Sequence, residues 1–125
     1  MRSRDEMIDK PHKKLDVWRK SIDLVQIIYD LTRSFPKNEA YGLAKQMRRA
    51  AISIPSNIGE GAARQTKREF VQFLHMAQGS LSELDTHLEI SKRLNYLKED
   101  NLQALSSLMN EIDKMITGLI KSLKK

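Results

Sequence analysis

The sequence predicts an all-α protein, an antiparallel up-down-up-down four-helix bundle. Three observations lead to this prediction. Four segments repeat apolar residues at three- and four-residue steps, which is the spacing of one face of a helix. No segment shows the alternation that is typical of a strand, and glycine and proline are scarce, at five and three of 125 residues. The connections between the four segments are short, so consecutive helices should run antiparallel.

The first helix is expected to begin near Leu15 and to end at Phe35-Pro36, because the residue before a proline is pushed out of the helical region. Two adjacent apolar stripes indicate that it is buried over a wide face. One stripe is Leu15, Trp18, Ile22, Val25 and Tyr29, and the other is Val17, Leu24, Ile28 and Leu31. Residues 1–14 are charged and almost free of apolar side chains. We therefore predict a mobile basic N-terminal tail over 1–14 and the bundle over 15–125.

The second helix is predicted from about Tyr41 to Gly61, and Pro55 inside it should cause a kink. The third should begin at Lys67, because Thr66 and Glu69 have the spacing of a capping box, and should continue to about Leu94. Asp100 is expected to cap the fourth helix. The apolar residues of that helix are Leu102, Leu105, Met109, Ile112, Ile116, Leu119 and Leu123.

The composition argues against several classes of protein. The chain contains no cysteine, so it has no disulfide framework, no thiolate metal site and no cysteine nucleophile, and a reducing cytoplasm is the expected location. The charged N-terminal residues lack the apolar core of a signal peptide. No run approaches the roughly 20 apolar residues of a membrane span, so we expect no membrane association.

The positive charge is concentrated in one stretch of the chain. The net charge is +6, and residues 41–68 alone carry six basic residues and one acidic residue, a net +5. Such a cluster is typical of a surface that contacts the phosphates of RNA or DNA, although a solvated helix face would have the same composition. The sequence shows no motif for reading bases, so binding would depend on charge and shape. The candidate nucleic-acid-binding residues are Lys45, Arg48, Arg49, Arg64, Lys67 and Arg68.

A strip of apolar and small residues, Ile52, Pro55 and Gly59, is predicted on the outer face of the second helix, among the basic residues. Glycine beside proline would allow another backbone to approach closely. We interpret the strip as a subunit contact, and the alternative is a loosely packed kink.

The residues needed for catalysis do not come together in the sequence. His75 and His87 are twelve positions apart on one helix, about 18 Å along its axis, so they cannot share a metal ion. Glu83 and His87 are four residues apart, not the three of the di-iron motif of helix bundles. We therefore expect no metal and no cofactor, and the sequence leaves open only that serine and histidine residues far apart in the chain meet in the fold.

Two stretches closely resemble a known protein family. These are YGLAKQMRRAAISIPSNIGEG, residues 41–61, and REFVQFLHMAQGSLSELDTHLEI, residues 68–90, and the earlier LDVWRKSIDLV is similar too. The chain resembles the small four-helix-bundle proteins encoded in intervening sequences within bacterial 23S ribosomal RNA genes. The resemblance extends over about residues 15–120. Gly59 stands where the family usually has alanine, and Asn95 where it often has glycine.

The resemblance implies a closed ring of five bundles without enzymatic activity. It also suggests kinship with the accessory variability proteins of diversity-generating retroelements, which form pentamers and assist a reverse transcriptase. The polar positions of the family motif correspond here to Gln46, Arg49, Ser53, Asn57 and Glu60, which we expect to form hydrogen bonds between helices or subunits.

These inferences lead to one main expectation, one alternative and, third and weakest, an enzyme of unknown chemistry. The main expectation is a non-catalytic homopentamer that binds RNA or DNA through its basic surface without strong sequence preference. The alternative is a scaffold protein that docks a reverse transcriptase or another protein, with the basic charge serving mainly solubility.

Overall fold

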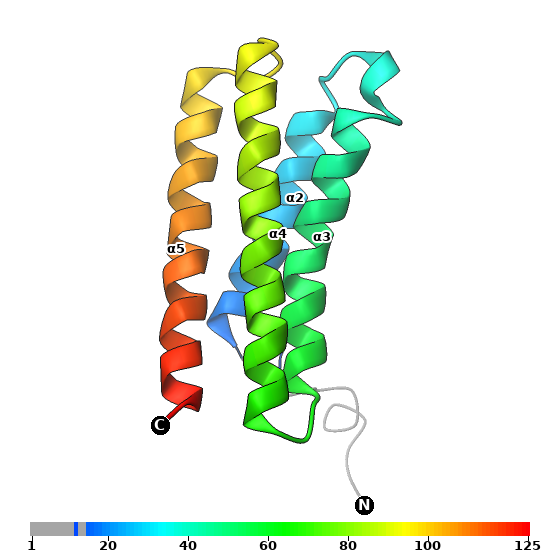
Figure 1. Ribbon diagram of the computed structural model, residues 1–125. Helices are drawn as coiled ribbons and strands as arrows, with labels where there is room; N and C mark the ends of the chain where they lie inside the picture. Colours follow the sequence, from blue (N-terminus) through cyan, green and yellow to red (C-terminus); the bar gives the residue numbers. More distant parts are fainter. Residues whose placement is uncertain (1–11, 13–14) are drawn as a thin grey trace, which may run out of the picture.

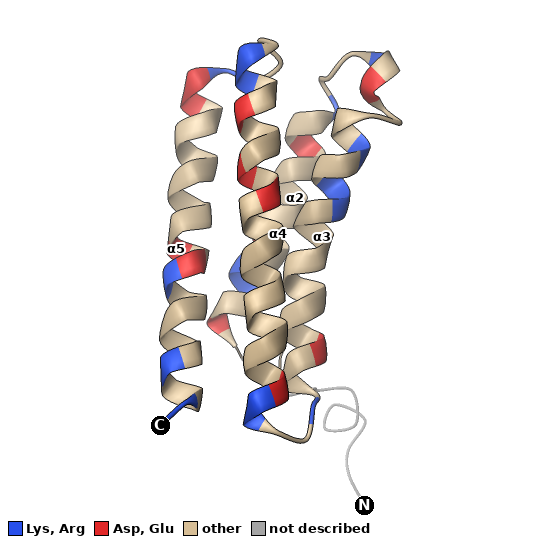
Figure 2. Ribbon diagram, in the orientation of Figure 1, with Lys and Arg blue, Asp and Glu red and all other residues tan. Residues whose placement is uncertain are grey.

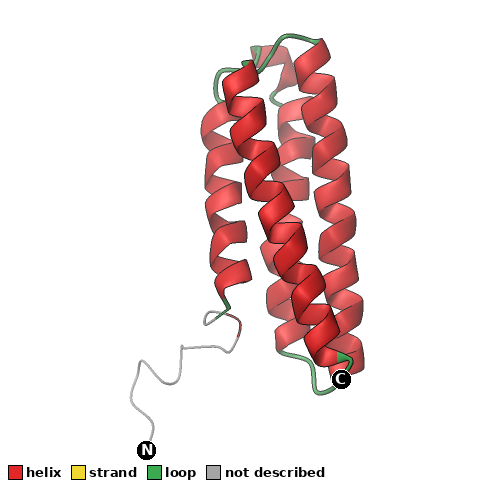
Figure 3. Ribbon diagram, turned by 90° about the vertical axis from the view of Figure 1, so that its left-hand side faces the viewer, coloured by secondary structure: helices red, strands yellow, loops and turns green. Residues whose placement is uncertain are grey.

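The computed structural model describes residue 12 and residues 15–125. The chain forms four long helices, which run alternately up and down and pack side by side (Figure 1). The helices are α2 (Asp16–Thr32), α3 (Leu43–Ala62), α4 (Lys67–Arg93) and α5 (Glu99–Leu123). A short 3₁₀ helix, η2 (Lys37–Glu39), lies in the connection between α2 and α3. The predicted four-helix bundle is confirmed, and the described part of the chain contains no strand (Figure 3).

The first two helices differ slightly from their predicted bounds. α2 ends at Thr32, before Phe35-Pro36, and the connection begins there. α3 begins two residues later than expected, at Leu43, and continues through Pro55, which does not end it. The predicted tail, residues 1–14, lies outside the described residues apart from His12.

The ends of α4 and α5 illustrate three ways of beginning or ending a helix. The Thr66 hydroxyl accepts a hydrogen bond from the backbone N–H of Glu69 at 3.1 Å, so the predicted cap of α4 is confirmed. α4 is followed by Asn95 at φ 60°, a left-handed conformation that asparagine tolerates better than most residues. The predicted Asp100 cap is wrong. α5 begins at Glu99 without a side-chain cap, and Asp100 lies in its first turn, where the helix dipole favours a carboxylate.

The core lies along the axis of the bundle and consists of aliphatic side chains from all four helices. Large members such as Leu24, Ile54, Leu84 and Ile112 are completely buried. α3 and α4 pack closely, because α3 presents small residues at several buried positions, among them Ala50. None of the described helices is long and apolar enough to cross a membrane.

Candidate nucleic-acid interface

The six candidate basic residues form two groups at opposite ends of α3. Figure 2 shows Lys and Arg gathered on the upper part of α3 and again around the start of α4 and the end of α5. The upper group is Lys45, Arg48 and Arg49, and the lower group is Arg64, Lys67 and Arg68. Lys45 and Arg64 are 19 residues apart, a rise of about 28 Å along a helix. The six residues therefore do not make one continuous surface.

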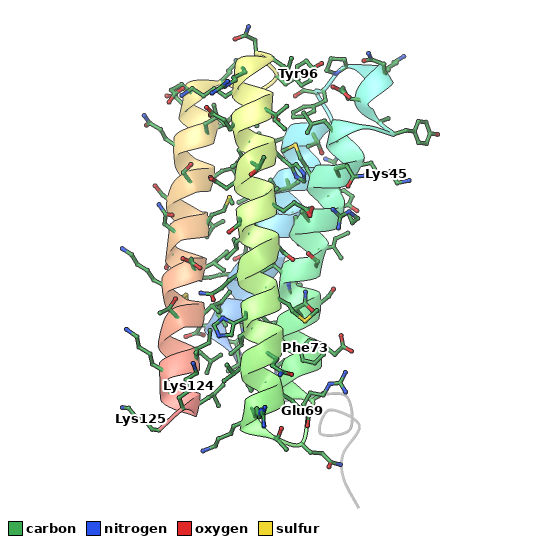
Figure 4. All side chains as sticks on the ribbon, in the orientation of Figure 1. Lys45, Glu69, Phe73, Tyr96, Lys124 and Lys125 are labelled. Atoms are coloured by element: carbon green, nitrogen blue, oxygen red, sulfur yellow. The ribbon has the colours of Figure 1, made fainter. Side chains whose placement is uncertain are left out.

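Two members of the upper group have partners within the bundle. Arg48 Nε donates a hydrogen bond to the Thr32 hydroxyl of α2 at 2.9 Å, and its guanidinium lies 4.7 Å from the centre of the Tyr29 ring. Arg49 lies on the other side, where it forms an ion pair with Glu83 of α4. Lys45 is exposed and extends away from the bundle (Figure 4). The upper group thus joins α3 to its two neighbours and leaves one lysine to solvent.

The lower group is more available. Arg64 contacts Glu60 at 3.0 Å and lies over the Phe73 ring at 4.7 Å. Lys67 and Arg68 are exposed, and their side chains form no ion pair or hydrogen bond with another residue in the part of the chain that the structure describes. Both occupy the first turn of α4, where the helix dipole disfavours positive charge. Electrostatic stabilisation of the fold therefore does not explain why Lys67 and Arg68 occupy these positions.

A groove at the same end of the molecule brings in a third cation. The lower groove lies between the start of α4 and the end of α5 and has a volume of about 450 Å³. Its lining residues are Lys67, Arg68, Val71, Gln72, His75, Leu123 and Lys124. Lys124 and Lys125 lie at the end of α5, close to the start of α4 where Glu69 is labelled (Figure 4). None of the lining residues is acidic, so the groove is a positively charged site.

The predicted apolar strip lies beside a groove between α2 and α3. Ile52 is 42% exposed, as the helical pattern indicated. Pro55 is buried, which corrects the expectation that it faces solvent, because α2 packs against this part of α3. Gly59 is half-buried, and the nearest atoms to a Cβ added there would belong to His12 and Trp18, at 3.4 and 3.6 Å, so an alanine would fit at this position.

This α2–α3 groove has a volume of about 430 Å³ and a mostly apolar lining. Its residues are His12, Trp18, Ile22, Val25, Ile52, Pro55, Ser56, Gly59 and Glu60. Ile22 is 40% exposed, so two large aliphatic side chains from different helices face solvent together. The groove is therefore an exposed apolar feature of the single chain.

The five polar residues of the family motif on α3 fall into two sets, those that bond to another helix and those that bond only within α3. Ser53 reaches α4, where its hydroxyl is hydrogen-bonded to that of Ser80 at 2.6 Å, and Arg49 also reaches α4. The other three bond within α3. Gln46 accepts from Arg49, Asn57 donates to the Ser53 carbonyl and Glu60 pairs with Arg64. For Gln46, Asn57 and Glu60, local bonds thus replace the expected bonds between helices of one subunit.

One histidine is unusual in its burial. The Nδ1 atom of His87 is buried and has no hydrogen-bond partner, and its Nε2 lies 4.0 Å from Glu83. Burial lowers the pKa of His87, and the attraction of Glu83 only partly opposes this effect. The described residues contain no group of three or more side chains able to hold a metal ion.

A comparison with family models identifies the chain's relatives. Residues 13–118 match the model of the 23S rRNA-intervening sequence protein family. The chain belongs to this family. A solved structure of an S23 ribosomal protein family member from Bacteroides thetaiotaomicron, described as a protein with unknown function, is 25% identical and superposes with a TM-score of 0.77. The match covers 84% of this chain and 98% of that one. No curated protein matches.

The sequence analysis did not include Lys124 among the candidate residues, although it lines the same groove as Arg68, which lies 56 residues earlier in the chain. The predicted antiparallel topology places the C-terminal lysines at the same end of the bundle as Lys67, but it does not contain the helix rotation that turns Lys124 into the groove. Sequence reasoning also missed the Tyr29 contact of Arg48, because that contact depends on how α2 and α3 are rotated against each other.

Proposed function

We propose that this protein is a non-catalytic, homo-oligomeric nucleic-acid-binding protein, which contacts RNA or DNA phosphates without strong sequence preference. The observation that supports it best is the lower end of the bundle. Lys67, Arg68 and Lys124 converge there on one groove without an acidic lining residue. Clustered cations of this kind bind polyanions by releasing the counterions condensed on the phosphates.

The two basic groups differ in how readily they can contact a phosphate. Lys67 and Arg68 can turn toward a phosphate without losing a partner in the described part of the chain. Arg48 and Arg49 would first have to leave Tyr29, Thr32 and Glu83. The lower group is therefore the principal phosphate contact in this proposal, and Lys45 is the contributor from the upper group.

Self-association supplies the second part of the proposal. Exposed apolar side chains that lie together usually mark a contact surface, and Ile22 and Ile52 meet in the α2–α3 groove. The family resemblance favours a ring of five. Five copies at +6 would carry 5 × 6 = +30 formal charges, which would strengthen attraction for a polyanion.

Binding is tested by fluorescence anisotropy with a labelled single-stranded RNA and a labelled DNA duplex over a range of salt concentrations. The affinity should fall steeply with salt, with a log-log slope of about −0.9 per phosphate contact on duplex DNA. The double variant Lys67→Gln with Arg68→Gln should bind weakly and show a shallower slope. The matched control, Lys98→Gln with Lys114→Gln, removes the same charge elsewhere and should bind nearly as well as the parent. A flat salt response, or equal loss in both variants, would contradict the proposed surface.

Self-association is tested by light scattering at fixed protein concentration. Ile52→Asp should reduce the measured mass while the helical circular dichroism is retained. Ile90→Asp on α4 is the control, since Ile90 is 41% exposed and Ile52 is 42% exposed. An Ile52→Asp protein of unchanged mass, or a parent protein with the mass of one chain, would refute the assignment of the groove.

The alternative scaffold function has one observation in its favour. Arg48, Arg49 and Arg64 all have partners in their own chain, so part of the basic charge serves the fold. A scaffold would use the apolar groove for a protein such as a reverse transcriptase. A reverse transcriptase gene beside this one would support the scaffold, and a position inside a ribosomal RNA gene would support the intervening-sequence role.

A further inference from the structure

We infer that the lower groove binds one unpaired nucleotide of a single-stranded nucleic acid, with its phosphate among Lys67, Arg68 and Lys124 and its base against Val71 and Leu123. This inference rests on the proposed function and makes it more specific, because it distinguishes unpaired strands from duplexes. It combines the charge of the groove, the chemistry of its apolar residues and the orientation of one polar side chain.

The charge of the groove comes from two neighbouring helices, α4 and α5, whose basic ends lie together here. Lys67 and Arg68 lie in the first turn of α4, and Lys124 directly follows α5. Nearby Glu69 is engaged in the cap of α4, where its carboxylate accepts a hydrogen bond from the Thr66 hydroxyl at 2.9 Å. The three cations repel one another, and a bound phosphate would relieve that repulsion.

The apolar part of the groove is what distinguishes it from an ordinary phosphate contact. Val71 and Leu123 are half-buried and line the groove beside the cations. The groove volume of about 450 Å³ lies within the range of small-ligand sites, roughly 300–1,000 Å³. A duplex presents phosphates outward while its base faces stay stacked inside. An unpaired nucleotide offers a phosphate and an apolar base face together, so it matches both halves of the groove.

A chain of hydrogen bonds orients His75 at the groove. Gln78 Nε2 donates to the Asp113 carboxylate at 3.1 Å and to the Thr117 hydroxyl at 3.0 Å. A carboxylate only accepts, so the amide is oriented with Oε1 toward His75 Nδ1, 3.2 Å away. Nδ1 therefore carries the proton of the neutral ring, and Nε2 can accept a hydrogen bond. An amino group or a hydroxyl of the nucleotide would supply the donor.

The upper group lacks this combination. Its one exposed cation without a partner in the described residues is Lys45, and Arg48 already covers the neighbouring Tyr29 ring. Lys45 lines neither the lower groove, nor the α2–α3 groove, nor the two grooves between α4 and α5. The upper group can contact a phosphate, but it gives no reason to prefer an unpaired strand.

The experiment measures the affinity of the full chain for a labelled polyuridine strand and for a labelled RNA duplex of the same length. The parent should prefer the single strand about tenfold or more. Leu123→Gln should weaken single-strand binding roughly fivefold and leave duplex binding unchanged, since an aliphatic contact with a base is weaker than the aromatic stacking common in such sites. Leu94→Gln, at the end of α4, is the matched control and should change neither affinity. Thermal unfolding of both variants checks that they fold.

A second measurement separates the phosphate from the base. Uridine monophosphate should displace the labelled strand at a lower concentration than inorganic phosphate does, and the difference should shrink in Leu123→Gln. Equal affinity for strand and duplex, or equal displacement by the two competitors, would overturn this inference while the general phosphate surface stands. Absence of any polyanion binding at low salt would overturn the proposed function and the inference together.

Discussion

Gly61 is the position at which the packing of α3 against α4 depends on the absence of a side chain. A Cβ at this position would lie 2.7 Å from Phe73 Cβ and 2.9 Å from Phe70 Cδ1. The first of these atoms is attached directly to the backbone of α4 and cannot move away by a rotamer change. Gly61→Ala should therefore push the two helices apart near the turn that joins them.

The magnitude follows from two opposing effects. Overpacking of this kind costs about 1–3 kcal/mol, and replacing a helical glycine with alanine stabilises the helix by about 1 kcal/mol. The net expectation for Gly61→Ala is a loss of up to about 2 kcal/mol. Gly79 and Gly118 lie in α4 and α5, and a Cβ added at either would have no atom within 4 Å. Each of those alanine substitutions should stabilise the protein by about 0.5–1 kcal/mol.

Thermal unfolding followed by circular dichroism measures all three variants at one protein concentration, because association would shift the midpoint. In a domain of this size, 1 kcal/mol corresponds to about 4 °C in Tm. Gly79→Ala and Gly118→Ala should raise the Tm by about 2–4 °C, and Gly61→Ala should lower it. A Gly61→Ala protein that gains stability as much as the other two would refute the argument from close packing.

Three further predictions concern individual side chains. Thr66→Ala should cost about 1 kcal/mol in denaturant unfolding through loss of the α4 cap, and Thr66→Ser should restore most of it. The lowered pKa of His87 means that the unfolded chain takes up a proton near pH 6.5 that the folded chain does not, so stability should decrease as the pH falls below 6.5. His87→Gln should flatten this dependence, and an unchanged pH profile would contradict the burial argument. Arg48→Gln should cost about 1–2 kcal/mol by losing its Thr32 and Tyr29 contacts, whereas Lys45→Gln should change stability by less than about 0.5 kcal/mol.

The candidate interface was only partly predictable from the order of residues. The concentration of basic residues in 41–68 can be read directly from the sequence, because it does not depend on the tertiary structure. It did not show that Arg48 and Arg49 turn toward different neighbouring helices, or that Lys124 joins Lys67. Helix-wheel angles describe one isolated helix, and they do not contain the rotation of that helix against its neighbours.

Periodicity, capping chemistry and the short connections determined the number of helices, the start of α4 at Lys67 and the alternation of chain direction, because these depend on residues close together in the chain. Tertiary structure decided the rest. It buried Pro55 beneath α2, excluded a side chain at Gly61, and turned Lys67 and Lys124 toward one groove between α4 and α5. Such contacts depend on the distance between the helix axes and on the rotation of each helix about its axis. Both are determined by the packing of the whole core, and no local sequence pattern specifies them.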